Sequence, residues 1–87
     1  MRKEMIVEIN DPPVYALGQK VRAKKGVRND GTFPGYNIGD HLISEGDIGY
    51  INNIGTFLQQ FYIYGVDFVD RGRMVGMRAK ELELVED

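Results

Sequence analysis

The stretch QFYIYGVDFVD, Gln60–Asp70, carries the strongest strand signal in the chain and decides its fold class. β-branched and aromatic residues of this kind fit the pleated surface of a sheet. Alternate positions share one side of a strand, which predicts a continuous apolar face made of Tyr62, Tyr64, Val66 and Phe68. The turn DRG, 70–72, has a glycine for positive φ and predicts a hairpin. Residues 73–79 then return as the partner strand, with Val75 and Met77 inward.

Other short runs, separated by turn residues, extend this sheet. The further predicted strands cover 19–25, 48 to about 54 and, after a helical or 3-10 turn at 80–82, residues 83–85. In the first of these, Val21 and Ala23 alternate with basic residues, as expected for a half-buried strand. The second follows a turn at 45–47 and contains Gly49, which permits a bend or the close approach of another backbone.

The predicted fold is all-β: a small SH3-like barrel of about five short strands, with one wide loop and an N-terminal arm. Closing the sheet is one way in which a short chain avoids exposed edges. The run Met5–Ile9 is followed by NDPP, whose prolines lack a backbone N–H, so residues 1–13 are expected to form an edge strand or a mobile arm. Residues 14–87 are expected to form the domain.

Composition excludes several classes of function. The chain has 87 residues, enough for one domain with a modest core. Its lack of cysteine removes disulfides and cysteine-ligated zinc or iron–sulfur sites, and no metal or other cofactor is expected. No stretch has the length of a signal peptide or membrane span, so a cytoplasmic protein is predicted.

The segment GVRNDGTFPG, Gly26–Gly35, is the predicted wide loop. Structural turns account for Gly31, Pro34 and Gly35, and Asn and Asp tolerate left-handed backbone. Turns do not require Arg28 or Phe33, and arginine and aromatic residues dominate interface energetics. The loop is therefore either two consecutive turns or a surface for a protein partner.

A second candidate contact lies at Gly55–Leu58. Gly55 and Thr56 are expected to form a turn, which leaves Phe57 and Leu58 either in the core or at an exposed tip. A small barrel cannot enclose every aromatic side chain, so one or two of Phe33, Tyr36 and Phe57 are expected at the surface.

Two other functions are weighed. The basic strand 20–28 carries Lys20, Arg22, Lys24 and Lys25, a pattern compatible with nucleic-acid binding. A solvated strand face, or a patch for an acidic protein, is favoured, because net charge is +4 through Arg28 and −6 thereafter. An enzyme would need His41 with Asp30 or Asp40, and Thr32 as a nucleophile, and these residues form no recognisable catalytic pattern.

Two segments in order, VRNDGT-PG and IGTFLQ followed by the tyrosine-rich strand, resemble the NifZ family of nitrogen-fixation accessory proteins. The resemblance runs from about Pro12 to Glu83. It implies an SH3-like fold and a chaperone-like, non-enzymatic role in forming the P clusters of the nitrogenase molybdenum–iron (MoFe) protein. The implied partner is the immature MoFe protein. The residues proposed to contact it are Arg28, Asn29, Asp30, Thr32, Phe33, Tyr36, Thr56 and Phe57.

Overall fold

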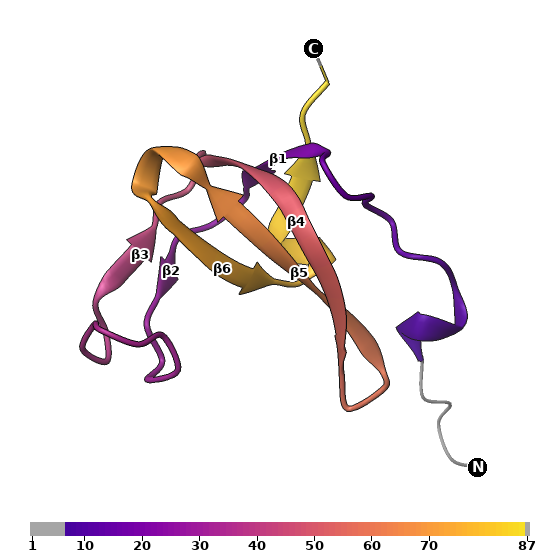
Figure 1. Ribbon diagram of the computed structural model, residues 1–87, viewed down its shortest axis with the longest axis horizontal. Coiled ribbons are helices and arrows are strands. Elements are labelled where there is room, and N and C mark those ends of the chain that lie inside the picture. Colours follow the sequence, from indigo (N-terminus) through magenta and orange to yellow (C-terminus); the bar gives the residue numbers. More distant parts are fainter. Residues whose placement is uncertain (1–6, 87) are drawn as a thin grey trace.

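The computed structural model describes residues 7–86, which form antiparallel β-strands and short 3-10 turns (Figure 1). The strands are β1 (Lys20–Ala23), β2 (Val27–Arg28), β3 (His41–Ile43), β4 (Ile48–Phe57), β5 (Phe61–Phe68), β6 (Arg73–Met77) and β7 (Leu82–Leu84). The 3-10 turns are η1 (Glu8–Asn10), η2 (Val69–Arg71) and η3 (Ala79–Glu81). The all-β prediction is confirmed for these residues. Among them, no helix is long and apolar enough to span a membrane.

Five strands form one sheet in the order β6-β5-β4-β1-β7, and β2 and β3 form a separate pair. The prediction of a closed barrel is wrong, because β6 and β7 lie at opposite edges of the large sheet and do not pair. Side chains from other segments reach these edges instead. Near β7, the Tyr15 hydroxyl donates to the Leu82 carbonyl at 3.0 Å. At β6 the contact runs the other way, because Arg73 of β6 donates through Nη1 to the Leu42 carbonyl of β3 at 3.2 Å.

The core follows the alternation predicted for the strands. The alternate residues of β1 and β5 point inward, together with side chains of β3, β4, β6 and β7. The buried apolar residues are Val21, Ala23, Leu42, Ile43, Ile51, Tyr64, Val66, Phe68, Val75, Met77 and Leu82. Tyr62, predicted on the same face, is half-buried at its margin. A Cβ at position 49 would lie only 2.5 Å from Val66 Cγ1. Because β5 approaches β4 so closely here, a glycine fits at this position and a larger residue would clash.

The β4–β5 hairpin is longer than predicted. Gly55, expected in a turn, lies within β4 opposite Ile63, and the chain reverses at Leu58–Gln60. The strands pair without interruption from Asn53–Gly65 to Phe57–Phe61, so the hydrogen-bonded ladder continues through the glycine. The hairpin therefore projects beyond the rest of the sheet as an arm (Figure 1).

The N-terminal segment is described from Val7 onward, so Met5 and Ile6 of the predicted edge strand lie outside the described residues. Residues 8–10 form η1, where an edge strand or a mobile arm was expected. This segment contacts the hairpin through side chains: the Glu8 carboxylate accepts from the Tyr62 backbone N–H at 2.9 Å. One backbone bond, from Ile9 N–H to the Gln60 carbonyl at 3.3 Å, also joins them. The division at residue 13 stays a prediction.

Candidate protein-binding surface

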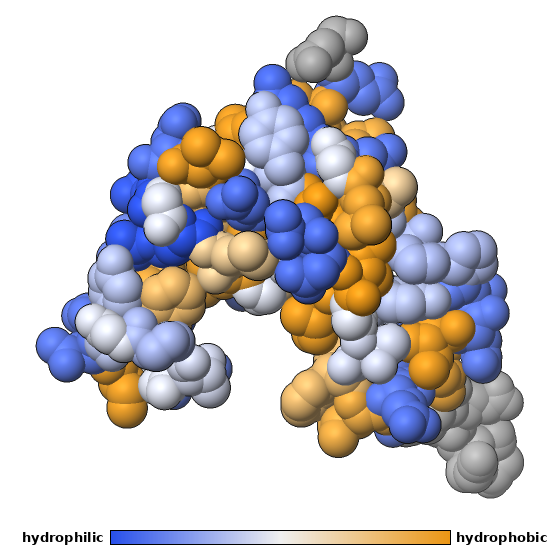
Figure 2. All heavy atoms as spheres, in the orientation of Figure 1, coloured by the Kyte–Doolittle hydropathy of each residue, from blue (hydrophilic) through white to orange (hydrophobic). Residues whose placement is uncertain are grey.

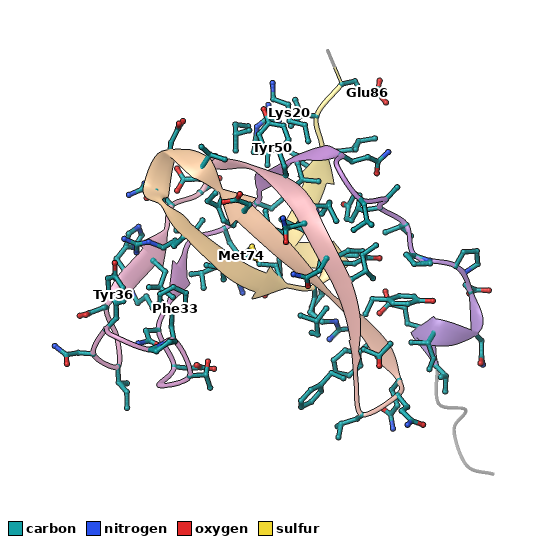
Figure 3. The ribbon with its side chains drawn as sticks, viewed as in Figure 1. Lys20, Phe33, Tyr36, Tyr50, Met74 and Glu86 are labelled. Atoms are coloured by element: carbon teal, nitrogen blue, oxygen red, sulfur yellow. The ribbon has the colours of Figure 1, made fainter. Side chains whose placement is uncertain are left out.

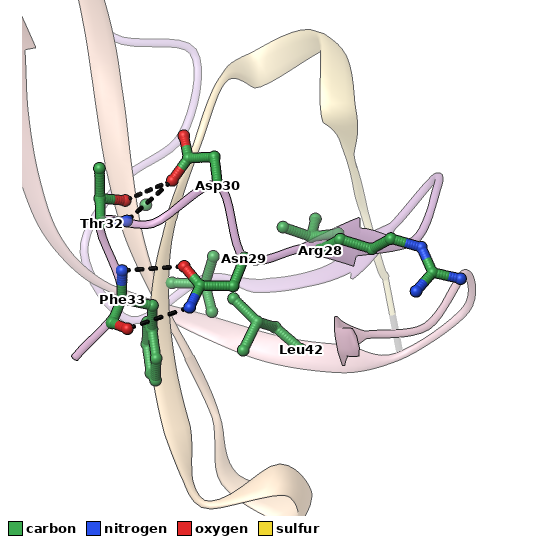
Figure 4. Close-up of a pocket in the computed structure, with 9 residues that line it drawn as sticks. Arg28, Asn29, Asp30, Thr32, Phe33 and Leu42 are labelled. Carbon is green, nitrogen blue, oxygen red and sulfur yellow. Dashed lines mark hydrogen bonds between the residues drawn. The ribbon is translucent and has the colours of Figure 1, made fainter. Parts of the chain in front are cut away.

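Asn29 organises the wide loop that connects β2 to β3. Its side chain is only 3% exposed and is surrounded by backbone groups of the loop. Its Nδ2 lies within hydrogen-bonding distance of three carbonyl oxygens, those of Phe33, Tyr36 and Asn37. Its Oδ1 accepts the backbone N–H groups of Gly31 and Phe33, both at 3.0 Å. Figure 4 shows the bonds to Phe33. A residue proposed to contact a partner thus lies inside the loop and determines its shape.

The neighbouring residues complete the loop by local hydrogen bonds. The Asp30 carboxylate accepts the Thr32 hydroxyl at 2.7 Å and the Thr32 N–H at 3.1 Å. These bonds favour the ionised carboxylate and hold the pKa of Asp30 below its ordinary value. Gly31 and Gly35 have φ of 106° and 85°, a conformation that glycine adopts without strain. Asp30 and Thr32 both remain exposed.

An arginine and two aromatic rings form the side of this loop that faces β6. Phe33 packs partly against the core and meets Tyr36 edge to face, with 5.3 Å between ring centroids. The Arg73 guanidinium lies 4.7 Å from the centre of the Tyr36 ring and donates to its hydroxyl at 3.1 Å. Figure 3 shows Phe33 and Tyr36 side by side in the loop. Arg73 was not predicted as a site residue, since the strand pattern gives no indication of this long-range contact.

Arg28 is exposed at the other side of the loop, where its Nη1 donates to the Gly39 carbonyl at 3.0 Å. Beside Arg28, between the wide loop and β6, lies a hollow of about 230 Å³, shown in Figure 4. It is lined by Val27, Arg28, Asn29, Asp30, Thr32, Phe33, Leu42, Val75 and Gly76. The hollow combines apolar walls with an arginine and an aspartate, a composition suited to a side chain of a protein partner.

The tip of the β4–β5 hairpin is the second candidate contact. Phe57 and Leu58 are 51% and 68% exposed, and Thr56 and Gln59 beside them are also exposed. Leu58 and Gln59 have φ of 55° and 53° and are the only described residues other than glycine with positive φ. A left-handed conformation costs about 1–2 kcal/mol for an L-residue with a Cβ. The tip therefore presents an apolar side chain on an unfavourable turn.

Loop and tip are separate lobes of the molecule. Figure 2 shows a wide hollow between the lobe formed by the wide loop and the lobe formed by the hairpin, with apolar residues gathered on the hairpin lobe. The predicted contact residues are thus divided between the two lobes, with Thr56 and Phe57 on the hairpin and the others on the loop. A protein partner that touches both would have to enter or span this hollow.

The basic strand is partly neutralised by the C-terminal acidic residues. Arg22 forms an ion pair with Glu83 at 2.9 Å, and Lys25 lies 3.7 Å from Glu81. Both pairs arise because β7 and η3 pack beside β1. Cations that already face carboxylates are less available to phosphate groups, so this arrangement weakens the nucleic-acid alternative.

The side chains considered for catalysis have different partners. His41 Nε2 lies 2.7 Å from the Ser44 hydroxyl, whereas Asp40 accepts the Asn37 backbone N–H at 2.8 Å. Asp30, as described above, binds Thr32. The described residues contain no group of three or more His, Cys, Asp or Glu side chains arranged to hold a metal ion. Among the described residues no hydrogen bond joins His41 to Asp30, Asp40 or Thr32, so the combination considered for catalysis is not brought together.

Comparison with known proteins gives a consistent result. Residues 12–84 match the model of the NifZ domain. The chain is 51% identical over 80 residues to a NifZ protein of Sinorhizobium fredii, covering 92% of this chain and 74% of the relative. It is 54% identical over 71 residues to one of Rhodobacter capsulatus, covering 82% and 91%. With NifZ of Azotobacter vinelandii, identity is 46% over 72 residues, covering 83% of this chain and 45% of that longer protein. No solved structure matches the chain.

Proposed function

The chain belongs to the NifZ family of non-catalytic nitrogen-fixation accessory proteins, and from this membership we propose that it assists maturation of the nitrogenase MoFe protein. In this proposal the protein binds an immature MoFe protein and promotes formation of its P clusters. It would do so by contact alone, holding the partner in a state that permits cluster assembly.

The observation that carries this proposal is the wide loop fixed by Asn29. Five side-chain contacts from one buried amide hold the loop in a defined shape, so its exposed groups are preorganised. Those groups include Arg28 and Thr32, which line the hollow beside β6, and Tyr36, which contacts Phe33 and Arg73. A rigid loop that displays arginine and aromatic side chains has the composition of a protein-binding surface.

We also propose that the domain is an open relative of the SH3-like barrel. The supporting feature is the order β6-β5-β4-β1-β7, in which the first strand of the large sheet pairs with the last. A long connection with its own β2–β3 pair separates β1 from β4, as the wide loop of such a domain would. Residues 14–87 would be this unit, and residues 1–13 its arm.

Co-purification tests the function. A tagged form of the protein should capture the MoFe protein from cells in which its clusters are immature, and should capture little of the mature protein. Ile38, 78% exposed, is the most exposed large apolar residue described in the wide loop. The double variant Arg28→Ala and Ile38→Ser changes two exposed loop residues, and it should lower this capture at least about tenfold.

Val69→Ser is the matched control for that variant. Val69 is also a large, exposed apolar residue, 59% accessible, but it lies in η2, outside both the wide loop and the hairpin. The control should capture the immature partner as the unmodified protein does. Equal capture of immature and mature MoFe protein would contradict the proposed function.

A further inference from the structure

The turn at the hairpin tip is poorly matched to its own sequence. The Gln60 N–H donates to the Phe57 carbonyl at 3.1 Å, which closes a four-residue turn with Leu58 and Gln59 at its centre. Positive φ at both central positions is the pattern of a type I′ turn, for which Asn-Gly is strongly preferred. Leu-Gln is thus unfavourable for folding, and Leu58 additionally leaves most of its side chain in water.

The hairpin is also free of charge. Charged residues make up 28% of the chain, yet none occurs from Ile48 to Val66, a segment that contains all of β4 and most of β5. The exposed positions near the tip are polar but uncharged, such as Thr56 and Gln59. Depletion of charge with enrichment of aromatic residues is the composition of the centre of a protein–protein interface.

Contacts near the base of the turn restrain this arm. The Tyr62 hydroxyl donates to the Asp11 carbonyl at 2.6 Å, and its backbone N–H donates to Glu8. The Arg78 guanidinium lies 3.7 Å from the centre of the Phe61 ring, and that ring lies 5.6 Å from the ring of Phe57. The tip is therefore displayed by an arm that is held in place from one side.

From these observations we propose that Phe57 and Leu58 insert into an uncharged apolar cleft on a protein partner. The identity of that partner as an immature MoFe protein rests on the proposed function. The proposal that the tip inserts rests on the turn conformation, the exposure and the lack of charged residues in the hairpin. An uncharged arm can enter such a cleft without desolvating an ionised group. In this view Leu58 serves contact with the partner at the expense of folding stability, and Gln59 is not itself a contact residue.

Two other occupants fit less well. Binding to an anionic membrane is strengthened by unpaired lysine and arginine near the inserted residues. The segment 48–66 has neither, and the Arg78 guanidinium on Phe61 lies 3.9 Å from the Glu8 carboxylate. A second copy of this chain would offer the hollow beside β6, whose lining includes Arg28 and Asp30. Seating an apolar tip there would remove water from two charged groups without pairing them with the tip.

Two single substitutions separate contact from folding. Leu58→Asn removes the apolar side chain but suits the left-handed turn, and it should weaken capture of the immature MoFe protein at least about tenfold with no loss of thermal stability. Gln59→Gly keeps Leu58 and relieves the other left-handed residue. It should raise Tm by about 4 °C or more and leave capture unchanged.

The controls make each outcome decisive. Val69→Asn, a similar change at an exposed apolar residue far from the tip, should capture as the unmodified protein does. If the unmodified protein captures the partner and Leu58→Asn captures it equally, the proposal that the tip inserts into the partner is wrong, and the proposed function stands. If the unmodified protein captures nothing, the proposed function fails. Sedimentation of the protein with vesicles of neutral and anionic phospholipid that depends on Leu58 would contradict the proposal and show that the tip binds lipid. A dimer in analytical ultracentrifugation that is lost on Leu58→Asn would contradict it too, and would show that the tip binds a second copy of the chain.

Discussion

The wide loop and the hairpin tip form two lobes of one small protein, and they are stabilised in opposite ways. In the loop, the buried amide of Asn29 satisfies five backbone groups, and the glycines stand where φ is positive. At the tip, residues without a turn preference occupy left-handed positions, and the large side chains of Phe57 and Leu58 are exposed. The loop sequence suits its fold, whereas the tip sequence does not.

This difference separates residues that determine the shape of a lobe from residues that would contact a partner. Residues such as Asn29 are needed for the loop to exist, so their loss would impair binding only by altering the structure. Leu58 contributes little to folding, so an effect of its loss on binding would report a direct contact. This contrast between the two lobes would be wrong if the loop kept its shape without Asn29, or if the hairpin needed its present turn residues to fold.

The largest effect is expected from Asn29→Ala. Alanine removes the side-chain bonds of Asn29 and leaves partly buried backbone groups, such as the Phe33 carbonyl and N–H, without these partners. We expect the free energy of unfolding to fall by about 2–4 kcal/mol, measured by urea denaturation at neutral pH. Asn37→Ala is the matched control, because the Asn37 side chain is exposed and the hydrogen bonds described for this residue use its backbone. A loss below about 0.5 kcal/mol for Asn29→Ala, similar to a surface substitution, would show that the loop is held by other contacts.

The positions of most strands of the large sheet could be predicted from the sequence, but whether a single polar side chain is buried or exposed could not. Alternation placed Val21, Ala23, Val66 and Phe68 in the core because period 2 is a local property of the chain. Asn29 was interpreted as a surface contact, and the structure buries it. Whether an asparagine turns inward depends on where Phe33 and Tyr36 place their carbonyl groups, which the local pattern does not specify.

The hairpin tip shows a second limit of prediction from the sequence, which concerns where the chain reverses. Gly55 and Thr56 have the composition of a turn, and Leu58 and Gln59 do not, so turn chemistry placed the reversal too early. The register of the hairpin is determined by pairing along the whole of β4 and β5, which overrides local preference at its end. A departure from local preference of this kind is itself an indication of a functional site.

An intermediate effect is expected at the base of the hairpin. In Gly49→Ala the new Cβ would lie 2.5 Å from Val66 Cγ1 and 3.0 Å from the Asp67 carbonyl, so β5 or its side chains must shift. We expect a loss of about 1–3 kcal/mol in the free energy of unfolding by urea denaturation. Gly55→Ala near the tip meets nothing within 4 Å and should change stability by less than about 0.5 kcal/mol. Equal losses at the two glycines would mean that the tip is packed as tightly as the base.

The smallest effect concerns the ion pair between Arg71 and Asp47, which joins η2 to the turn between β3 and β4. Arg71 Nε donates to Asp47 Oδ2 at 2.7 Å, and this bond is the main reason that the pKa of Asp47 lies below its ordinary value of 3.8. Stabilisation from a carboxyl with a lowered pKa is fully present well above 3.8 and is lost as pH falls through the folded-state pKa. Arg71→Gln should therefore lower Tm by a small amount at pH 7, and the difference from the unmodified protein should shrink below about pH 4.

Lys24→Gln changes net charge equally and is the control for that pH dependence, because Lys24 is exposed on another strand connection. Its effect on Tm should not follow the titration of Asp47. The same experiment distinguishes the two lobes: amide NMR signals of residues 44–47 should move through this pH range, whereas those of residues 55–59 lie in the uncharged segment and should stay constant. Movement of the tip signals with the Asp47 titration would show that the hairpin responds to the polar contacts beside the loop, and the two lobes would then not be independent.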